Sequence, residues 1–416
     1  MAATEKDVVI LRELAQKYMG YASLPVQGEK RALWVSLNNL NMQKPMVCID
    51  QMPWNELDVD GSLICQVQDP YFRHVENWLR QLIYKWEHLP VDMVLEPYIL
   101  IPRLIGNTGY GIQILEQTIN YDPTSYVHSH TYINQFEELE DIEKIKTPQI
   151  SVNRKGEQEK MQEALRIFEG IAPVKFSGEI VHLGLWDKVS TLMGVENCYI
   201  ELLDRPELLH AVMDRFTSAT ISMVEQLNQL GLYDVNSHMC HCSYTYDGKL
   251  PTGNCDLDNP TSRDGWAFGL AQLFTAVSPE ITAEFEVPYM QRLFPYFGAI
   301  YYGCCEGLDD RLDIISRMPN IRKVSCSPWS DRDHFAEVLP KNYVMSNKPT
   351  PALLASPSFD EDAVRADLRH TIRAARTHGV ALEMILKDIS TVCYQPQRLW
   401  RWAEIAAEET LRAAEA

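Results

Sequence analysis

Residues 298–327 read GAIYYGCCEGLDDRLDIISRMPNIRKVSCS, and this stretch decides the predicted fold. It begins with a short apolar run, 298–305, and ends with a second strand-like segment, 321–327. Between them the spacing of apolar residues predicts a helix. A strand, a crossover helix and a second strand in this order require parallel pairing. The first of these two segments is almost continuously apolar, as a strand covered on both faces should be.

The same alternation extends over most of the chain. We predict further strands over 91–100, 173–181, 233–241, 343–348 and 380–386. Helical patterns cover 3–20, 71–88, 156–169, 206–231, 278–296, 360–378 and 395–415. About eight such units close most economically into a (β/α)8 TIM barrel. We predict this barrel as the catalytic domain over 71–416, with 1–70 as a helical N-terminal extension packed on it.

An open, doubly wound sheet is the alternative architecture. No GxGxxG motif follows a predicted strand, which disfavours the dinucleotide-binding form of that fold.

The composition indicates a folded, acidic protein. The chain has 416 residues, of which 46% are hydrophobic, so it can bury a large core. Its formal charge of −19 disfavours binding to nucleic acids and to anionic membranes, since both need a basic protein surface. We find no signal-peptide pattern and no apolar run long enough to span a bilayer. We therefore expect a cytoplasmic protein whose ten cysteines are mostly free thiols.

Barrel enzymes carry their chemistry at the carboxyl ends of the strands, so polar residues predicted there are candidate site residues. The candidates are His238, Cys240, Cys242, Cys304, Cys305, Glu306, Cys326, Asn347, Asp388 and Cys393. No GxSxG, Walker loop, HExxH or kinase motif occurs, so serine hydrolase and nucleotide hydrolase activities are unsupported. A glycosidase that uses Glu179 and Glu383 is an alternative, but nothing marks these two residues as a pair.

The adjacent cysteines 304 and 305 leave a choice between buried packing and a metal site. A disulfide between them would close a strained ring. Along an extended chain Cys304 and Glu306 point to one side and Cys305 to the other. A thiolate and a carboxylate, completed by a distant thiol, would form a three-ligand zinc site with an open fourth position. The alternative is two packed cysteines followed by an exposed glutamate.

Two further groups of residues have both a structural and a functional interpretation. His238, Cys240 and Cys242 alternate in the stretch NSHMCHCS and share one face of the predicted strand, whereas His241 belongs to the other face. Their spacing allows metal binding, but such residues at a barrel mouth often only line a pocket. Cys393 follows the last predicted strand, where a thiol more often serves packing than chemistry.

Several segments resemble the uroporphyrinogen decarboxylase superfamily, particularly its cobamide-dependent methyltransferase branch. LEDIEKIKTP (139–148) is similar to the acidic helix-to-loop segment of that family, and 192–221 is similar to the helical region that follows it. The most specific match is VSPEITAEFEVPYMQRLF, residues 277–294. The resemblance extends from about residue 70 to the end of the chain, and it implies the TIM barrel of this superfamily.

The resemblance also implies a zinc site. When the segments are aligned without gaps, Cys304 and Glu306 fall on the first two ligand positions of the methyltransferase branch, and Cys393 falls on the last. A slip of one or two residues would make Cys305 a ligand instead. The Cys/Glu/Cys set differs from the His/Cys/Cys set of enzymes that methylate thiols. It resembles the zinc set of methyltransferases that take a methyl group from an oxygen substrate.

The implied activity is a zinc-dependent methyl transfer. The methyl group would move from a small O- or N-methylated substrate, such as an aryl methyl ether, to the cobalt of cobalamin held on a separate corrinoid protein. We expect His238 or Glu96 to act as proton donors, and Cys240 and Asn347 to contact the cofactor. A homodimer is one possible assembly, and we expect neither nucleic acid nor membrane as a partner.

The same resemblance leaves two other functions open. One is decarboxylation, but residues 41–57, NMQKPMVCIDQMPWNEL, lack the arginine-rich segment with which the decarboxylases of the superfamily hold substrate carboxylates. The other is a non-catalytic barrel that binds a tetrapyrrole or corrinoid.

Overall fold

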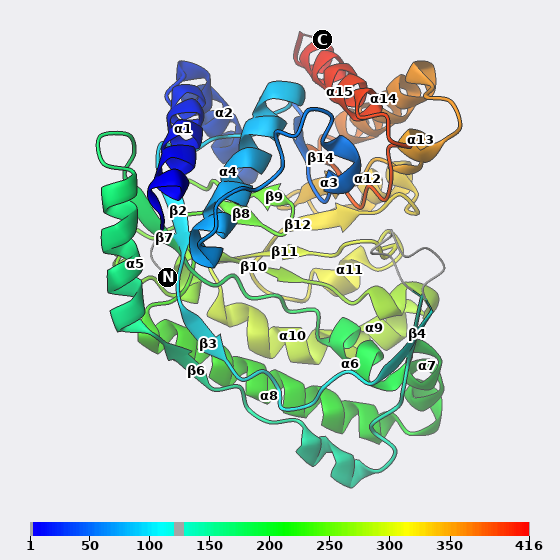
Figure 1. Cartoon of the computed structure of the whole chain (residues 1–416). Coiled ribbons are helices and arrows are strands. Elements are labelled where there is room, and N and C mark those ends of the chain that lie inside the picture. The colour runs from blue at the N-terminus through cyan, green and yellow to red at the C-terminus, as the bar shows by residue number, and fades with distance from the viewer. Residues whose placement is uncertain (1–2, 120–128, 416) are drawn as a thin grey trace.

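The computed structural model describes residues 3–119 and 129–415. Its centre is a six-stranded parallel sheet with the strand order β1-β14-β13-β12-β11-β10 (Figure 1). The strands are β1 (Met46–Ile49), β10 (Trp266–Gly269), β11 (Ala299–Tyr302), β12 (Ile321–Cys326), β13 (Val344–Asn347) and β14 (Ala381–Leu386). Almost every residue in them is buried, which confirms the four predicted strands between 298 and 386.

Backbone hydrogen bonds continue this sheet beyond both edges. Past β10, the amide of Phe268 donates to Val181 and the amide of Leu183 donates to Phe268. Past β1, the amide of Asp92 donates to Val47. The chain after Asp92 and the chain before Val181 also pair with each other. There β2 (Ile99–Pro102) pairs in parallel with β7 (Val174–Ser177). The sheet is therefore curled in the manner of a TIM-like barrel, with six strands in its continuous ladder.

Helices cover the outside of the curled sheet (Figure 1). They are α4 (Pro70–His88), α5 (Arg154–Ile167), α6 (Leu185–Met193), α7 (Val195–Asp204), α8 (Pro206–Leu230), α9 (Pro279–Phe285), α10 (Val287–Leu293), α11 (Leu312–Ile315), α12 (Arg332–Val338), α13 (Ala352–Ala355), α14 (Glu361–Thr377) and α15 (Gln397–Glu415). The predicted helix over 278–296 is divided into α9 and α10, because Pro288 lacks the N–H that a continuous helix needs. Across the described residues, we find no helix with the length and apolar character of a membrane span.

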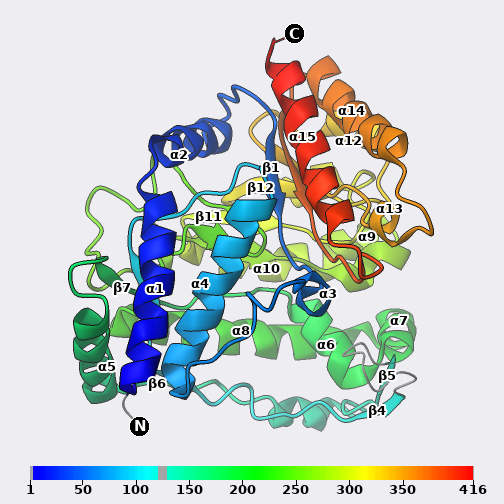
Figure 2. The same cartoon turned by 45° about the horizontal axis from the view of Figure 1, so that its top comes forward.

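The first 70 residues contribute helices and a strand. α1 (Glu5–Ala22) lies alongside α4, and α2 (Pro25–Asn38) follows it (Figure 2). After β1 comes the short helix α3 (Trp54–Leu57). Because β1 pairs with β14, the segment that was expected to be only a helical extension contains an integral strand of the sheet.

Three antiparallel pairs of short strands lie outside the main sheet in the described part of the chain. They are β3 (Ile105–Asn107) with β6 (Ile150–Val152), β4 (Glu116–Ile119) with β5 (Ser129–Tyr132), and β8 (Met239–Cys240) with β9 (Ser243–Tyr244). The β8–β9 hairpin replaces the longer strand predicted over 233–241. Its turn carries His241, with a φ of 55°.

Polar side chains fill part of the interior of the curled sheet. Lys323 of β12 and Glu383 of β14 are both 0% exposed and form an ion pair with an N–O distance of 2.6 Å. Ser243, from the β8–β9 hairpin, accepts a hydrogen bond from Lys323 at 2.7 Å and donates to Glu383 at 2.8 Å. Glu383 is therefore engaged in a buried ion pair, and the hairpin closes the interior at this level.

Candidate functional site

The carboxyl ends of β11 and β14 bring two thiols and a carboxylate together. The sulfur of Cys304 lies 3.5 Å from that of Cys305, and the sulfur of Cys305 lies 3.4 Å from Oδ2 of Asp388. One ligand atom from each residue lies within 4.8 Å of the other two. Within the described ranges, these three residues form the group whose spacing suits a metal ion. We call Cys304, Cys305 and Asp388 the thiol cluster.

Two backbone turns place the thiol cluster. Gly303 has a φ of 90° directly after β11, and a Cβ at this position would lie 2.5 Å from Cδ1 of Leu308. Glycine is the residue that accepts this conformation without strain. Asp388 has a φ of 54° just after β14, a left-handed conformation that aspartate tolerates better than most residues. Both turns lie at the same end of the parallel sheet, so the side chains that follow them meet.

A lysine and a histidine surround the thiol of Cys304. Nζ of Lys387 donates to its sulfur at 2.9 Å, and Nε2 of His241 lies 3.9 Å from the same atom. The His241 ring is held by stacking on Phe268, with 3.9 Å between ring centroids. A hydrogen bond from Cys305 lowers the pKa of the Cys304 thiol, and those from His241 and Lys387 add to this effect against the opposing effect of burial. The sulfur therefore favours the thiolate form.

Glu306, the predicted carboxylate ligand, faces two backbone amides. Its Oε2 accepts the amide of Cys304 at 2.8 Å, and its Oε1 accepts the amide of Ala271 at 3.2 Å. Burial raises the pKa of Glu306 to about 7, although these hydrogen bonds act to lower it. The side chain ties the loop after β11 to the loop after β10, and it lies outside the thiol cluster.

Cys393, the predicted distant thiol, also lies outside the thiol cluster. Its sulfur is 3.6 Å from the carbonyl oxygen of Ala355 in α13, and its φ is 56°. Glu56 shapes this loop, because its Oε2 accepts the amides of Val392 and Tyr394 at 2.8 and 3.0 Å. The structure therefore does not bring the predicted set of Cys304, Glu306 and Cys393 together. Cys305 and Asp388 join Cys304 instead.

A cavity of about 230 Å³ opens beside the thiol cluster. Cys305, Lys387 and Asp388 contribute to its lining at the strand ends. The other walls are mainly apolar and rigid, and they include Pro328, Trp329, Pro349 and Pro351. Trp329 is 82% exposed, so its indole forms an accessible flat surface at the rim.

The predicted proton donors, His238 and Glu96, lie together around Tyr246. Glu96 accepts the hydroxyl of Tyr246 at 2.6 Å and forms an ion pair with Arg31 at 2.9 Å. His238 stacks on the Tyr246 ring with 4.7 Å between centroids, and burial lowers its pKa. Among the described residues, neither side chain forms a hydrogen bond with the thiol cluster.

Cys240 and Asn347, predicted to contact a cofactor, are each 0% exposed. Burial raises the pKa of the Cys240 thiol. Asn347 donates to the carbonyl of Cys326 at 3.5 Å and accepts the hydroxyl of Thr371 at 3.3 Å. In this structure both side chains are packed in the interior, and neither lines the cavity beside the thiol cluster.

His241, Lys387 and Asp388 are site residues that the predicted ligand and donor sets omit. Lys387 and Asp388 directly follow the strand VALEMIL, so the rule that placed Asp388 at a strand end could also have selected its neighbour. An unbroken strand would turn His241 away from the site. The turn between β8 and β9 directs its imidazole toward Cys304 instead, and no simple sequence pattern predicts that turn.

Comparisons with known proteins give a distant likeness to solved structures. No protein-family model matches the chain, and no curated protein matches it. Among solved structures, the chain is similar to a methyltransferase from Methanosarcina mazei, with 13% sequence identity and a TM-score of 0.48. The match covers 92% of this chain and 97% of that chain. A likeness of this degree carries no conclusion about activity.

Proposed function

We propose that the chain is a zinc-dependent methyltransferase with a closed TIM barrel, and that the thiol cluster forms its metal site. The observation that carries this proposal is the convergence of two thiols and a carboxylate within 4.8 Å at the carboxyl ends of two parallel strands. Barrel enzymes hold their reactive groups at this end of the sheet. The reaction class is supported by the resemblance of residues 139–148, 192–221 and 277–294 to the cobamide-dependent methyltransferase branch.

The donor set of the thiol cluster fits zinc. Thiolates are soft ligands that favour zinc over magnesium or calcium, and zinc also accepts a carboxylate oxygen. Three protein ligands leave a fourth position for substrate. The surroundings of Cys304 favour its thiolate, which is the form that a metal ligand needs. When zinc is bound, it would supply a Lewis acid for the oxygen or nitrogen that carries the methyl group.

Lys387 has two roles in this proposal. Its Nζ lies 2.9 Å from the sulfur of Cys304 and 2.9 Å from Oδ2 of Asp388, so it balances the negative charge of the ligands. It also holds a proton in the lining of the cavity. Lys387 is therefore better placed than His238 or Glu96 to protonate the demethylated oxygen of the substrate.

The cavity favours a small and flat substrate. A volume of about 230 Å³ with walls of Pro328, Trp329 and Pro349 suits an aryl methyl ether. The methyl acceptor would be the cobalt of cobalamin on a separate corrinoid protein that docks over the mouth. Trp329 and Tyr394, which are 82% and 72% exposed, offer aromatic surface for that contact.

Metal analysis of purified variants tests the ligand set. We expect about one zinc per chain in the wild type, as for a three-ligand catalytic site. The zinc should be lost in Cys304→Ala, Cys305→Ala and Asp388→Asn and retained in the matched control Cys393→Ala. Loss of zinc from Cys393→Ala and its retention in Asp388→Asn would instead support the set predicted from sequence. A wild-type chain without zinc, even after incubation with the metal, would remove the basis of the proposal.

The reaction is tested by mixing the zinc-loaded chain with cob(I)alamin and a panel of methoxyarenes. We expect absorbance changes that report methylcobalamin, together with release of the corresponding phenol. Tight cobalamin binding without methyl transfer would support the non-catalytic corrinoid-binding barrel. Release of carbon dioxide from a carboxylated tetrapyrrole would support decarboxylation.

A further inference from the structure

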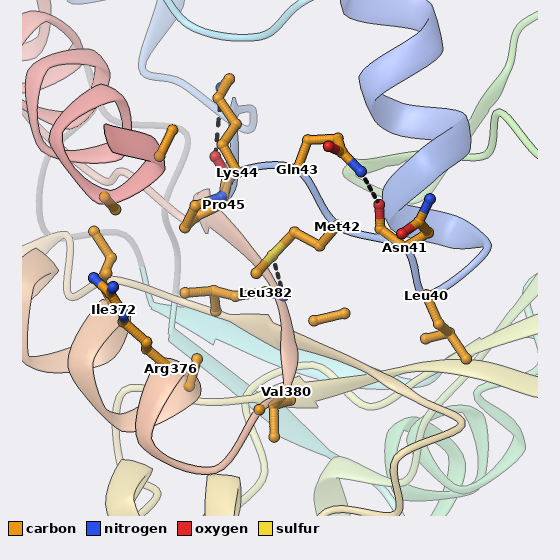
Figure 3. A pocket seen from close by; sticks show the side chains of 15 residues that line it. Leu40, Asn41, Met42, Gln43, Lys44, Pro45, Ile372, Arg376, Val380 and Leu382 are labelled. Atoms are coloured by element: carbon orange, nitrogen blue, oxygen red, sulfur yellow. Dashed lines mark hydrogen bonds between the residues drawn. The ribbon is translucent and has the colours of Figure 1, made fainter. Parts of the chain in front are cut away.

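A second cavity lies at the end of the sheet opposite the thiol cluster. It has a volume of about 490 Å³ and lies between the loop 40–45, the end of α14, the start of β14 and the end of α15 (Figure 3). Residues 380–382 line it, whereas Lys387 and Asp388, beyond the other end of β14, line the cavity beside the thiol cluster. The two cavities are therefore separate sites, and we call this one the basal cavity.

The walls of the basal cavity suit an apolar ligand body. Met42 from the loop, Ile372 from α14, and Val380 and Leu382 at β14 project around it (Figure 3). Ala413, near the end of α15, completes this side with a small side chain. The volume lies within the range in which proteins bind small organic molecules.

The charges around the basal cavity point to an anion. None of its fifteen lining residues is acidic, although the chain as a whole has a formal charge of −19. Two lining residues, Lys44 and Arg376, are basic. Lys44 is neutralised by Asp92 at 2.7 Å. The side chain of Arg376 is exposed and forms no hydrogen bond or ion pair with any other described residue, and its guanidinium lies at the α14 side of the cavity (Figure 3).

A backbone donor in the same cavity also has a weak partner. The amide of Leu382 donates to the thioether sulfur of Met42 at 3.1 Å (Figure 3). A thioether is a poor acceptor compared with a carboxylate oxygen. The basal cavity thus offers a free guanidinium and a weakly held N–H, and a negatively charged ligand would satisfy both kinds of donor better than a neutral one.

We propose that the basal cavity binds a small organic anion with an apolar body, of the class of medium-chain carboxylates. Arg376 would pair with the acid group, while Met42, Ile372 and Leu382 would cover the chain. This site is independent of the proposed methyl transfer. Its ligand would contact the start of β14 and would not enter the cavity beside the thiol cluster.

Calorimetric titration of the full-length chain with octanoate tests the proposal. We expect saturable binding to one site, and we expect Arg376→Gln to weaken it by about tenfold or more, because a charge-assisted pair is lost. Arg373→Gln, an exposed arginine on the same helix that does not line the cavity, is the matched control and should bind as the wild type does. Ala413→Trp should abolish binding by filling the cavity. Circular dichroism would verify that each variant is folded.

Three results would overturn the proposal. One is the absence of saturable octanoate binding by the wild type. Another is equal binding by the Arg376 and Arg373 variants, because the anion would then sit elsewhere. The third is equal affinity for neutral 1-octanol, which would mean that the charge of the ligand is irrelevant. None of these results bears on the zinc content of the chain, so this test and that of the thiol cluster fail independently.

Discussion

The thiol of Cys304 has three neighbours that stabilise its negative charge, namely Cys305, His241 and Lys387. We predict that the chain, freed of metal by a chelator, keeps one thiolate at about pH 6, more than two units below the ordinary pKa of a cysteine. The thiolate persists at this pH because the pKa of Cys304 is lowered, and it is lost only when the pH falls through that lowered value. Thiolate absorbance near 240 nm, followed during an acid titration, measures it.

Substitutions assign that thiolate to its residue. Cys304→Ala should remove the absorbance that persists at low pH, and Lys387→Met should shift its loss to higher pH. Cys393→Ala is the control variant and should keep the absorbance that persists at low pH, because Cys393 lies outside the thiol cluster. A titration that looks the same in Cys304→Ala and in the wild type would contradict the assignment.

The candidate site could be predicted from sequence only where the chain is locally regular. Cys304 lies directly after a clearly apolar strand, so its place at the mouth follows from strand periodicity. The side on which Cys305 falls does not follow, because Gly303 leaves the extended conformation that the alternation of side chains assumes. Cys393 comes at the end of a longer loop in which Glu56, from far away in the sequence, decides the path of the backbone.

Among the elements, the strands β12 and β14 are joined by the buried pair of Lys323 and Glu383. We predict that Glu383→Gln lowers the free energy of unfolding by about 3 to 5 kcal/mol, because it leaves an uncompensated ammonium in the interior. The double variant Lys323→Met, Glu383→Leu should regain most of this loss, since it buries no charge. Urea unfolding of the three proteins measures the difference. A double variant as unstable as the single one would show that packing, rather than charge, decides the stability here.

The helices α14 and α15 are held together by Glu409. This carboxylate is buried and accepts hydrogen bonds from Arg365 at 2.8 Å and from Arg369 at 2.7 Å. Burial alone would raise the pKa of Glu409, but the two arginines outweigh it, and the pKa is lowered. The carboxylate therefore stabilises the fold above the unfolded-state pKa of about 4, and this contribution disappears as the pH falls through the folded-state value.

We predict that Glu409→Gln lowers the free energy of unfolding by about 1 kcal/mol at pH 7, a modest value because solvent screens the arginines. The difference from wild type should shrink as the pH falls below about 4, and it should vanish only below the lowered folded-state pKa, where the wild-type carboxylate is also neutral. Glu404→Gln on the same helix is the control, since the side chain of that glutamate is 51% exposed and its ion pair among the described residues is with Arg401. Thermal unfolding at several pH values measures both variants. A constant difference across the pH range would rule out the ionic explanation.

The elements that sequence predicts are those with long or strongly apolar patterns. The helices near 71–88, 206–231 and 360–378 are confirmed by α4, α8 and α14. Two strands of the main sheet, β1 and β10, were not predicted, because neither is flanked by a long helical pattern on both sides. Their positions depend on pairing with β14 and β11, which are distant in sequence, and this is tertiary information.

For the whole molecule, the N-terminal helices and the curled sheet share one hydrophobic core. Leu11, Tyr18 and Trp34 pack in the same cluster of buried side chains as Tyr301 and Ile385 from the sheet. We predict that the chain unfolds in a single cooperative transition and that removal of residues 1–40 leaves no soluble, folded protein. Calorimetry of the full chain and expression of the shortened one provide the measurements. Two separate transitions, or a folded shortened chain, would show that the N-terminal segment is an independent unit.

The β8–β9 hairpin has a kinetic consequence for this architecture. It packs against Lys323 and Glu383 in the interior of the curled sheet, so under the proposed function we expect reactants to reach the thiol cluster only from the carboxyl ends of the strands. Under the proposed function, the small methylated molecule must be inside before the bulky carrier protein seats itself on the rim. An excess of the corrinoid protein should then slow turnover, because it would bind the enzyme before the methylated substrate does. Steady-state rates measured against the concentration of the corrinoid protein should pass through a maximum.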